Sequence, residues 1–342
     1  MKDEKIFSMF KGKNVLITGG TGSFGQALTK KLLKSNVNQI RIFSRNEFKQ
    51  IEMESKISDK RMRFFIGDVR DWSRLNLAFE DVDYVFHAAA LKHVPKVEYN
   101  PFEAIKTNVI GSQNVIDACI KNSVDKAICV GTDKAVSPLN TYGATKLLME
   151  KLFVTANNYL NPEKHPTKFI AVRYGNVLGS SGSVVPKFIQ QIREKQKITI
   201  TSNNMTRFSI LMDEALEFVI NALYIGKGSE IFLPKIRSYE ISELKMALFE
   251  LLENHGEKII GIRPGEKLNE VLINDYEIPN TWEVSNMYMI LNDIVTNFPI
   301  SELRKIYPGI KHVKNMKDYS SHTVNKITKE ELKSKIKKAK LI

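Results

Sequence analysis

The chain has 342 residues, of which 43% are hydrophobic, and its formal net charge is +13. This length predicts one large domain, or a large and a small one, with a core that needs no disulfide or metal to hold it. The charge suits a nucleic-acid binder, a membrane-surface protein or an enzyme whose ligands carry phosphates, so by itself it does not choose among them.

The sequence lacks the signals of export and membrane insertion. No stretch reaches the ~20 apolar residues that a bilayer-spanning helix needs. The start, MKDEKIFSMFKGK, is too charged and its apolar part too short for a secretory signal. We therefore expect a cytoplasmic protein. Cys119 and Cys129 lack metal or redox spacing, which predicts core residues and no metal site.

Apolar, β-rich runs alternate with amphipathic segments long enough for crossover helices. In chain order the runs are KNVLIT, QIRIF, MRFFI, VDYVFHA, DKAICV and KFIAVRY. This alternation is typical of a parallel sheet covered on both faces. It predicts an α/β protein, a Rossmann-type doubly wound parallel sheet with a smaller mixed α/β substrate-binding lobe.

The pattern also predicts domain boundaries. Its regularity loosens after about residue 175, at the glycine- and serine-rich GNVLGSSGSVVPKF. We expect a nucleotide-binding domain over 1–175, to which 209–235 returns, and a lobe that is mainly substrate-binding over 176–292. A basic C-terminal extension covers 293–342, and its end, KITKEELKSKIKKAKLI, is interpreted as a solvated helix or tail.

The first strand runs into a glycine-rich turn and a helix, in VLITGGTGSFGQALTKKLL. Gly19 permits the turn, Gly22 lets a pyrophosphate approach the backbone and Gly25 allows close helix packing. The helix N-terminus faces the anion. A glycine trio alone is a weak signal, but after a strand and before a helix it predicts dinucleotide binding.

The second strand ends in FSRNEFKQ, where an NAD enzyme would place an acid on the ribose 2′-hydroxyl. Ser44 and Arg45 stand there instead, with Lys49 as a possible second cation. A guanidinium suits a 2′-phosphate, which favours NADP over NAD. Glu47 argues the other way, and the alternative for Arg45 is an exposed residue at a strand end.

Two further strand ends complete the expected cofactor site. Asp68 and Val69, in IGDVRD, could hold the adenine, and the small residues of HAAALKH let the chain pass close under the cofactor. The residues expected to bind the cofactor are Thr18, Gly19, Thr21, Gly22, Ser23, Phe24, Gly25, Ser44, Arg45, Lys49, Asp68, Val69, Ala88, Ala89, Tyr142 and Lys146.

Proton-transfer groups gather in GTDKAVSPLNTYGATK. Tyr142 and Lys146 fall one turn apart on one face of a predicted helix. A nearby ammonium and a positive nicotinamide ring would lower the pKa of the phenol, so that Tyr142 could take the proton of a sugar hydroxyl. Asp133 and Lys134 add an acid and a base, unless they form a solvated pair in the loop.

These motifs resemble known families. TGGTGSFG, YGATK and RYGN are similar to the extended short-chain dehydrogenase/reductase superfamily. Within it, TDKAVSPLNTYGATK, HAAALKHVP, RYGNVLGSSGSVVP, MTRF and GIRPGEKLNE resemble the inverting UDP-N-acetylglucosamine 4,6-dehydratases of the pseudaminic-acid type. The likeness runs from about residue 10 to about residue 275.

The resemblance implies roles for the catalytic residues. Tyr142 and NADP would oxidise C4 of UDP-N-acetylglucosamine, with the hydroxyl of Thr132 bonded to the developing C4 oxygen. Lys134, with its pKa lowered by desolvation, would remove the C5 proton. Asp133 would protonate the departing 6-hydroxyl. Hydride return to C6 and reprotonation of C5 from the opposite face would give the inverted 4-keto-6-deoxy sugar, for a surface or flagellar glycan.

The resemblance also implies a substrate side and an assembly. The family resemblance implies a homo-oligomer, a dimer or a hexamer. His87 and His93 are interpreted as structural residues. Lys92 matches a residue near the sugar and phosphates. The residues expected to bind UDP-N-acetylglucosamine are Lys92, Asn176, Val184, Arg207, Arg263 and Glu266.

Alternative functions stay open. A UDP-sugar 4-epimerase or a retaining 4,6-dehydratase of the same fold would share Tyr142 and Lys146, although an epimerase has no use for Asp133 and Lys134. A non-catalytic nucleotide- or nucleic-acid-binding relative would exploit the charge. We expect no nucleic-acid partner, because the basic residues lack aromatic interleaving.

Overall fold

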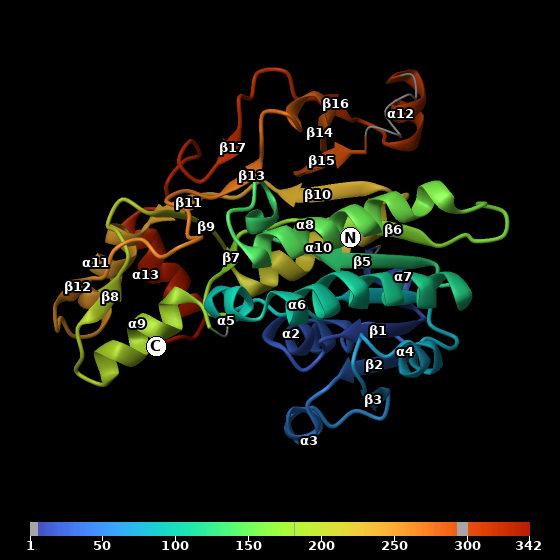
Figure 1. Ribbon diagram of the computed structural model, residues 1–342, viewed down its shortest axis with the longest axis horizontal. Helices are drawn as coiled ribbons and strands as arrows, with labels where there is room; N and C mark the ends of the chain where they lie inside the picture. The colour runs from blue at the N-terminus through green and yellow to red at the C-terminus, as the bar shows by residue number, and fades with distance from the viewer. Residues whose placement is uncertain (1–5, 181, 293–299) are drawn as a thin grey trace.

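The computed structural model describes residues 6–180, 182–292 and 300–342. Its centre is a ten-stranded sheet in the order β16-β14-β15-β10-β6-β5-β4-β1-β2-β3 (Figure 1). In this order, the strands from β10 to β3 run parallel to one another. On the other side of β10, the strands β15, β14 and β16 continue the sheet in antiparallel pairing. The strands are β1 (Asn14–Thr18), β2 (Gln39–Ser44), β3 (Met62–Ile66), β4 (Tyr84–His87), β5 (Lys126–Val130), β6 (Lys168–Val172), β10 (Glu230–Pro234), β14 (Thr281–Val284), β15 (Met287–Leu291) and β16 (Lys311–His312).

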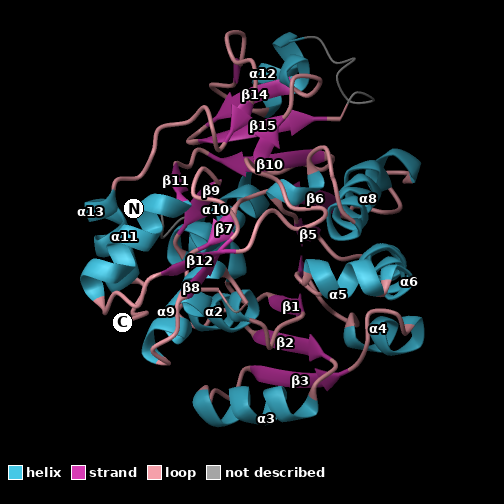
Figure 2. Ribbon diagram, turned by 60° about the vertical axis from the view of Figure 1, so that its left-hand side comes forward, coloured by secondary structure: helices cyan, strands magenta, loops and turns pink. Residues whose placement is uncertain are grey.

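Helices cover both faces of this sheet (Figure 2). Val15 and Ile17 of β1 pack into one apolar cluster and Leu16 into the other, as the period of two in a strand requires. The first face carries α2 (Ser23–Leu32), α3 (Glu47–Lys56) and α10 (Met212–Ile225); the second carries α4 (Trp72–Ala78), α7 (Gly111–Lys121) and α8 (Thr141–Ala156). The predicted doubly wound α/β fold is confirmed.

A smaller lobe stands beside the carboxyl ends of the parallel strands. Its apolar cluster is formed by α9 (Val184–Arg193), α11 (Ile241–Leu251), α13 (Lys329–Lys338) and β8 (Ile198–Ile200). Its other strands are β7 (Asn176–Val177), β9 (Thr206–Ile210), β11 (Ser238–Glu240), β12 (Glu257–Ile259), β13 (Val271–Ile273) and β17 (Tyr319–Ser320). Outside this lobe, the further α- and π-helices of the described residues are α5 (Val94–Tyr99), α6 (Pro101–Ala104), a π-helix (Ile105–Ile110) and α12 (Ile300–Ile306).

The end of the chain differs from the solvated helix or tail expected from its lysines. Leu332 and Ile336 are fully buried in the apolar cluster of the smaller lobe. Past the helix, Leu341 lies so close to Gly179 that a Cβ there would overlap its side chain. The interpretation of a solvated segment is wrong, because residues spaced by four put one apolar stripe on α13.

The domain boundaries drawn from the sequence stay a prediction. Strand β10 lies beside β6 in the large sheet, and β14 and β15 extend the same sheet. In the described parts of the chain, no helix is both long and apolar enough to cross a membrane.

Candidate active site

A cavity of about 1060 Å³ opens where the parallel strands end and the smaller lobe begins. Ligands of doubly wound sheets bind at this edge. The predicted site residues in its walls are Gly19, Thr21, Gly22, Ser23, Phe24, Gly25, Ser44, Arg45, Lys49, Asp68, Val69, Ala88, Ala89, Lys92, Thr132, Lys134, Tyr142, Lys146, Asn176, Val184, Arg207, Arg263 and Glu266. Thr18 and Asp133 lie behind the walls.

Gly19 and Gly25 leave no room for a side chain in the glycine turn. Gly19 has a φ of +66°, and a Cβ there would lie 2.9 Å from the Cα of Ala89. A Cβ on Gly25 would overlap the carbonyl oxygen of Gly20. The first turn of α2 therefore opens directly on the cavity, which fits a bound pyrophosphate. Thr18 is fully buried and its Oγ1 lies 2.7 Å from Nδ1 of His87, so its role in the structure is to support the turn.

The cavity ends at β2 and β3 in a cluster of polar side chains. Arg45 is half exposed, with Nη1 at 3.6 Å from Oδ2 of Asp68. The hydroxyl of Ser44 accepts a hydrogen bond from Gln50. Lys49 lies in the first turn of α3, which Asn46 caps by accepting from the Lys49 backbone N–H at 2.8 Å. These groups can surround an anion at this end.

Helix α8 carries Tyr142 and Lys146 into the cavity. It begins at this point because the Asn140 side chain accepts a hydrogen bond from the Gly143 N–H. Burial lowers the pKa of Lys146 to about 8, and its Nζ donates to the carbonyl of Val130 at 2.6 Å. The ammonium is thus easily deprotonated, yet held at the end of β5.

Tyr142 differs from the expectation of a lowered pKa. Burial raises the pKa of its phenol. The ammonium of Lys134 and a hydrogen bond with Thr132 lower that pKa, but by less. The protein alone therefore keeps Tyr142 neutral. The cation that favours its ionised form most is Lys134, where we expected Lys146.

Buried polar contacts fix the position of α8. The fully buried guanidinium of Arg173 donates to Glu150 of α8 at 2.5 and 2.6 Å, and to Glu277 at 2.7 and 3.0 Å. Asn108, in the π-helix, donates to Thr145 of α8 at 3.0 Å. These bonds tie the helix to β6 and to the segment after β13, so Tyr142 and Lys146 are held from both lobes.

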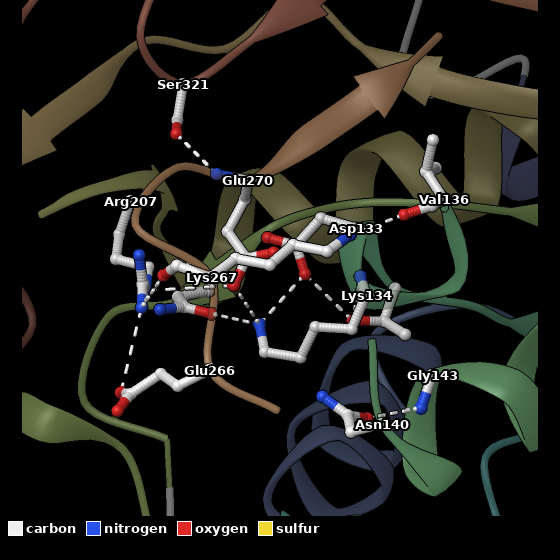
Figure 3. A network of polar contacts seen from close by, with 12 residues as sticks. Asp133, Lys134, Val136, Asn140, Gly143, Arg207, Glu266, Lys267, Glu270 and Ser321 are labelled. Atoms are coloured by element: carbon white, nitrogen blue, oxygen red, sulfur yellow. Dashed lines mark hydrogen bonds and ion pairs between the residues drawn. The ribbon is translucent and has the colours of Figure 1, made fainter. Parts of the chain in front are cut away.

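Lys134 lies in a buried cluster of charges (Figure 3). Its Nζ is 3.0 Å from Oδ1 of Asp133 and 3.3 Å from Oε1 of Glu270, and it also donates to Oδ1 of Asn176 at 3.4 Å. Oδ2 of Asp133 and Oε2 of Glu270 are buried and have no hydrogen-bond partner among the described residues. The alternative of a solvated Asp133–Lys134 pair does not fit this geometry.

The charges in this cluster change the protonation expected for Lys134. Burial by itself lowers the pKa of Lys134, but the carboxylates of Asp133 and Glu270 raise it above the ordinary value for lysine. The lowered pKa expected from desolvation is wrong for this structure, in which Lys134 is an ammonium. Burial raises the pKa of Asp133, and Glu270 raises it further, so Asp133 holds a proton more readily than a free aspartate.

The two arginines predicted to bind the substrate differ in their exposure to solvent. Arg207 is buried and donates to the carbonyls of Thr206 at 2.7 Å and Leu268 at 3.0 Å, so it holds the loop of the GIRPGEKLNE motif against β9. Its Nη2 is 3.8 Å from Oε1 of Glu266. Arg263 lies on the exposed side of the same loop, where its guanidinium can reach a ligand.

Sequence reasoning missed Glu270 and Lys187. Glu270 is the last residue of GIRPGEKLNE, a motif from which only Arg263 and Glu266 were selected. Lys187 lies on α9, in the wall near Arg263, and burial and that guanidinium lower its pKa. Its position three residues after Val184, in the same helix, was the available signal.

The histidines and cysteines differ in position. His87 is fully buried, stacks on Phe153 and has its pKa lowered to about 3 by burial. His93 lies in the cavity wall, at the residue before α5. Cys119 and Cys129 are buried and free. The described residues contain no group of histidine, cysteine and acidic side chains that could hold a metal ion.

The doubly wound sheet, the glycine turn and the Tyr142–Lys146 pair at one cavity define an enzyme of the short-chain dehydrogenase/reductase type. Sequence comparison then identifies the family. Residues 15–292 match the model of the polysaccharide biosynthesis protein family, and the chain belongs to that family. This enzyme group contains dehydratases and epimerases of nucleotide sugars.

Relatives of both kinds are similar over most of the chain. A UDP-N-acetylglucosamine 4,6-dehydratase (inverting) of Campylobacter jejuni is 51% identical, with 86% of this chain and 89% of the relative covered. A UDP-glucose 4-epimerase of Rickettsia conorii is 40% identical, with 95% of each covered.

Solved structures agree with the fold. The X-ray structure of Pen from Bacillus thuringiensis has a TM-score of 0.89 and 40% identity, covering 97% of this chain and 99% of that one. The dTDP-glucose 4,6-dehydratase DesIV from Streptomyces venezuelae, solved with NAD bound, has a TM-score of 0.68 at 19% identity and covers 75% and 86%. The second likeness concerns the fold alone.

Proposed function

We propose that this protein is an inverting UDP-N-acetylglucosamine 4,6-dehydratase, a hydro-lyase that makes a 4-keto-6-deoxy sugar. The observation that carries the proposal is the buried Asp133–Lys134–Glu270 cluster, of which Lys134 and Glu270 line the cavity wall that also holds Tyr142. An acid and a base beside the tyrosine that accepts the hydroxyl proton suit a reaction that loses water. The identity to the Campylobacter jejuni relative supports the same choice.

The first step is oxidation at C4. The residues of the glycine turn and of the end of β2 would hold a nicotinamide cofactor, which would supply the acceptor for the C4 hydride and its donor to C6. For this step Tyr142 first loses its own proton to solvent; as a phenolate, which the ammonium of Lys134 and the Thr132 hydroxyl at the cavity wall favour, it accepts the proton of the 4-hydroxyl. Asn140 and the Arg173 cluster keep α8 in place during this transfer.

The second step is elimination across C5 and C6. A ketone at C4 makes the C5 hydrogen acidic, and Lys134 removes it as an amine. Asp133, whose pKa is raised by burial, supplies the proton with which the 6-hydroxyl leaves as water. Reprotonation of C5 from the opposite face, by a proton that exchanges with solvent, gives UDP-2-acetamido-2,6-dideoxy-β-L-arabino-hexos-4-ulose. Arg263, Lys187 and Lys92 face the cavity as cations for the diphosphate.

We propose NADP as the cofactor, with Ser44, Arg45 and Lys49 around its 2′-phosphate. The support is the position of these groups at one end of the cavity, where the half-exposed Arg45 is free to turn toward a ligand from its 3.6 Å contact with Asp68. Arg45→Ala is expected to weaken NADP binding by about tenfold or more and NAD binding little, because a charge-assisted bond contributes roughly 1.5–3 kcal/mol. Calorimetric titration with both dinucleotides measures this; equal losses would favour NAD.

The test of function is incubation of the purified protein with UDP-N-acetylglucosamine in heavy water, without added cofactor, followed by proton NMR. A 4-keto-6-deoxy product with deuterium at C5 and L-arabino coupling constants is expected, and Lys134→Ala should lose it. The retaining dehydratase would give the other C5 configuration. A 4-epimer with protonated C5, made equally well by the mutant, would favour the epimerase that the Rickettsia conorii relative is named for.

We further propose a homo-oligomer. Apolar side chains are exposed near the second face of the sheet, on α6, the π-helix and α8: Phe102, Ile105, Ile110 and Leu148. Water-exposed apolar groups gathered on neighbouring helices suit a contact between copies. Light scattering of the purified protein would give the mass, and a monomer at micromolar concentration would contradict the proposal.

A further inference from the structure

Glu270 is held in place through its backbone. Its N–H donates to Oγ of Ser321 at 2.8 Å, and its carbonyl accepts from the Ser321 N–H at 2.7 Å. Strand β13 begins at the next residue and pairs with β17, which ends at Ser320. The backbone is thus fixed on both sides, and the side chain, only 2% exposed, is directed at Lys134 (Figure 3).

The resting cluster poses a problem for the proposed elimination. Lys134 must lose a proton before its Nζ can take the one on C5, and Asp133 must gain a proton before it can give one to the 6-hydroxyl. One transfer across the 3.0 Å between Nζ and Oδ1 of Asp133 meets both needs. The pair changes from ammonium and carboxylate to amine and carboxylic acid, and its total charge stays zero.

Glu270 is placed to hold a fixed charge beside this exchange. Its Oε1 lies 3.3 Å from Nζ of Lys134 and 3.8 Å from Nε of Arg207. Burial raises the pKa of Glu270, but Lys134, Arg207 and Lys267 more than offset this, so the carboxyl stays ionised. A negative charge there makes the loss of the shared proton harder and the ionisation of Asp133 less favourable.

We propose that Glu270 is a positioning residue that holds Nζ of Lys134 and, through its fixed negative charge, sets the pH range over which Asp133 and Lys134 share one proton. This inference deepens the proposed dehydratase function and rests on it. The cycle balances: the C5 proton goes to Lys134, the proton on Asp133 leaves in the water, and the pair returns to ammonium and carboxylate.

Other charged and titratable groups face Lys134 from every element around it. Apart from Asp133, none of them brings a carboxylate to Lys134, because among the described residues Asp133 and Glu270 are the carboxylates within 4 Å of Nζ. These other groups are Asp133 on the turn after β5, Tyr142 on α8, Arg207 on β9, Tyr239 on β11, and Lys267 on the loop before β13.

The test is the pH profile of kcat for the wild type, Glu270→Gln and Glu270→Asp. Removing a negative charge lowers the pKa values of both steps of the coupled pair. In Glu270→Gln both limbs of the profile should therefore move to lower pH by about one unit. Glu270→Asp draws the charge back by one methylene, and its profile should move in the same direction by less. Glu283→Gln, on β14 at a partly exposed ion pair with Lys235, is the matched control and should leave the profile unchanged.

The outcomes separate the inference from the function on which it rests. Far-UV circular dichroism checks folding, and if Glu270→Gln does not fold, Glu270→Asp decides. A slower enzyme with an unmoved profile makes Glu270 merely structural and overturns the inference. A wild-type protein that forms no 4-keto-6-deoxy product overturns the proposed function itself, before any variant is compared.

Discussion

The hydroxyl of Tyr142 can be removed with little change in packing, because phenylalanine keeps the buried ring. Tyr142→Phe should retain the fold and lose C4 oxidation, with kcat lowered by roughly 10²–10⁴ as for other positioned proton acceptors. Product formation from UDP-N-acetylglucosamine measures it. Tyr159→Phe, at a side chain that is 80% exposed, is the control, and a Tyr142→Phe enzyme of normal rate would remove Tyr142 from the chemistry.

His87 makes stability depend on pH. Its pKa is lowered from 6.5 to about 3 by burial, so below pH 6.5 the unfolded chain binds a proton that the folded chain does not. Stability is lost as pH falls through this range, by about 1.4 kcal/mol at pH 5.5 for this one group. Urea unfolding at pH 7.5 and 5.5 should show a smaller difference for His87→Gln than for the wild type. Equal differences would mean that His87 is protonated in the folded state.

At the scale of single residues, the sequence predicted those features of the site that depend on the spacing of nearby residues. Tyr142 and Lys146 are one helical turn apart, and the glycines follow a strand, so both patterns are local. Glu270 could not be found in this way, because its partner Lys134 is far away in the chain and the contact depends on how β13 pairs with β17. The pKa of Lys134 was mispredicted for the same reason, since burial was expected but the second carboxylate was not.

Among the elements, α13 shows how an apolar stripe can be overlooked in a basic segment. Leu332 and Ile336 are fully buried between α13 and the rest of the smaller lobe. Leu332→Ala should lower the free energy of unfolding by about 2–4 kcal/mol, the usual cost of a leucine-sized cavity. Denaturant titration measures it, with Lys337→Ala, on the exposed side, expected within ~0.5 kcal/mol of the wild type. Equal stability of the two variants would mean that α13 is not docked in solution.

Helix propensity and lysine content favoured α13 as a solvated helix, and only the spacing of its two apolar residues argued otherwise. In contrast, α2 and α8 were predictable because their starts carry a glycine turn and an Asn cap. The antiparallel strands β14 and β15 follow no βαβ pattern, and their place beside β10 is set by tertiary packing that the sequence does not display.

For the whole molecule, the cavity joins the strand ends to the smaller lobe, so a ligand that fills it should stabilise both. NADP at about 100 times its dissociation constant should raise the free energy of unfolding by about 2.7 kcal/mol. Thermal melting with NADP and with NAD at equal concentrations should give the larger shift for NADP, and Arg45→Ala should remove the difference. A larger shift for NAD in the wild type would reverse the cofactor assignment.

The position of β10 also bears on how the protein unfolds. This strand comes from the later part of the chain, yet it lies between β6 of the nucleotide-binding side and β15. The chain enters the smaller lobe after β6 and returns to the large sheet in β10, so unfolding the lobe alone would loosen the strand that joins β6 to β15. On heating or under proteolysis the protein should therefore unfold as one cooperative unit. The binding of cofactor and the binding of sugar should then be lost together.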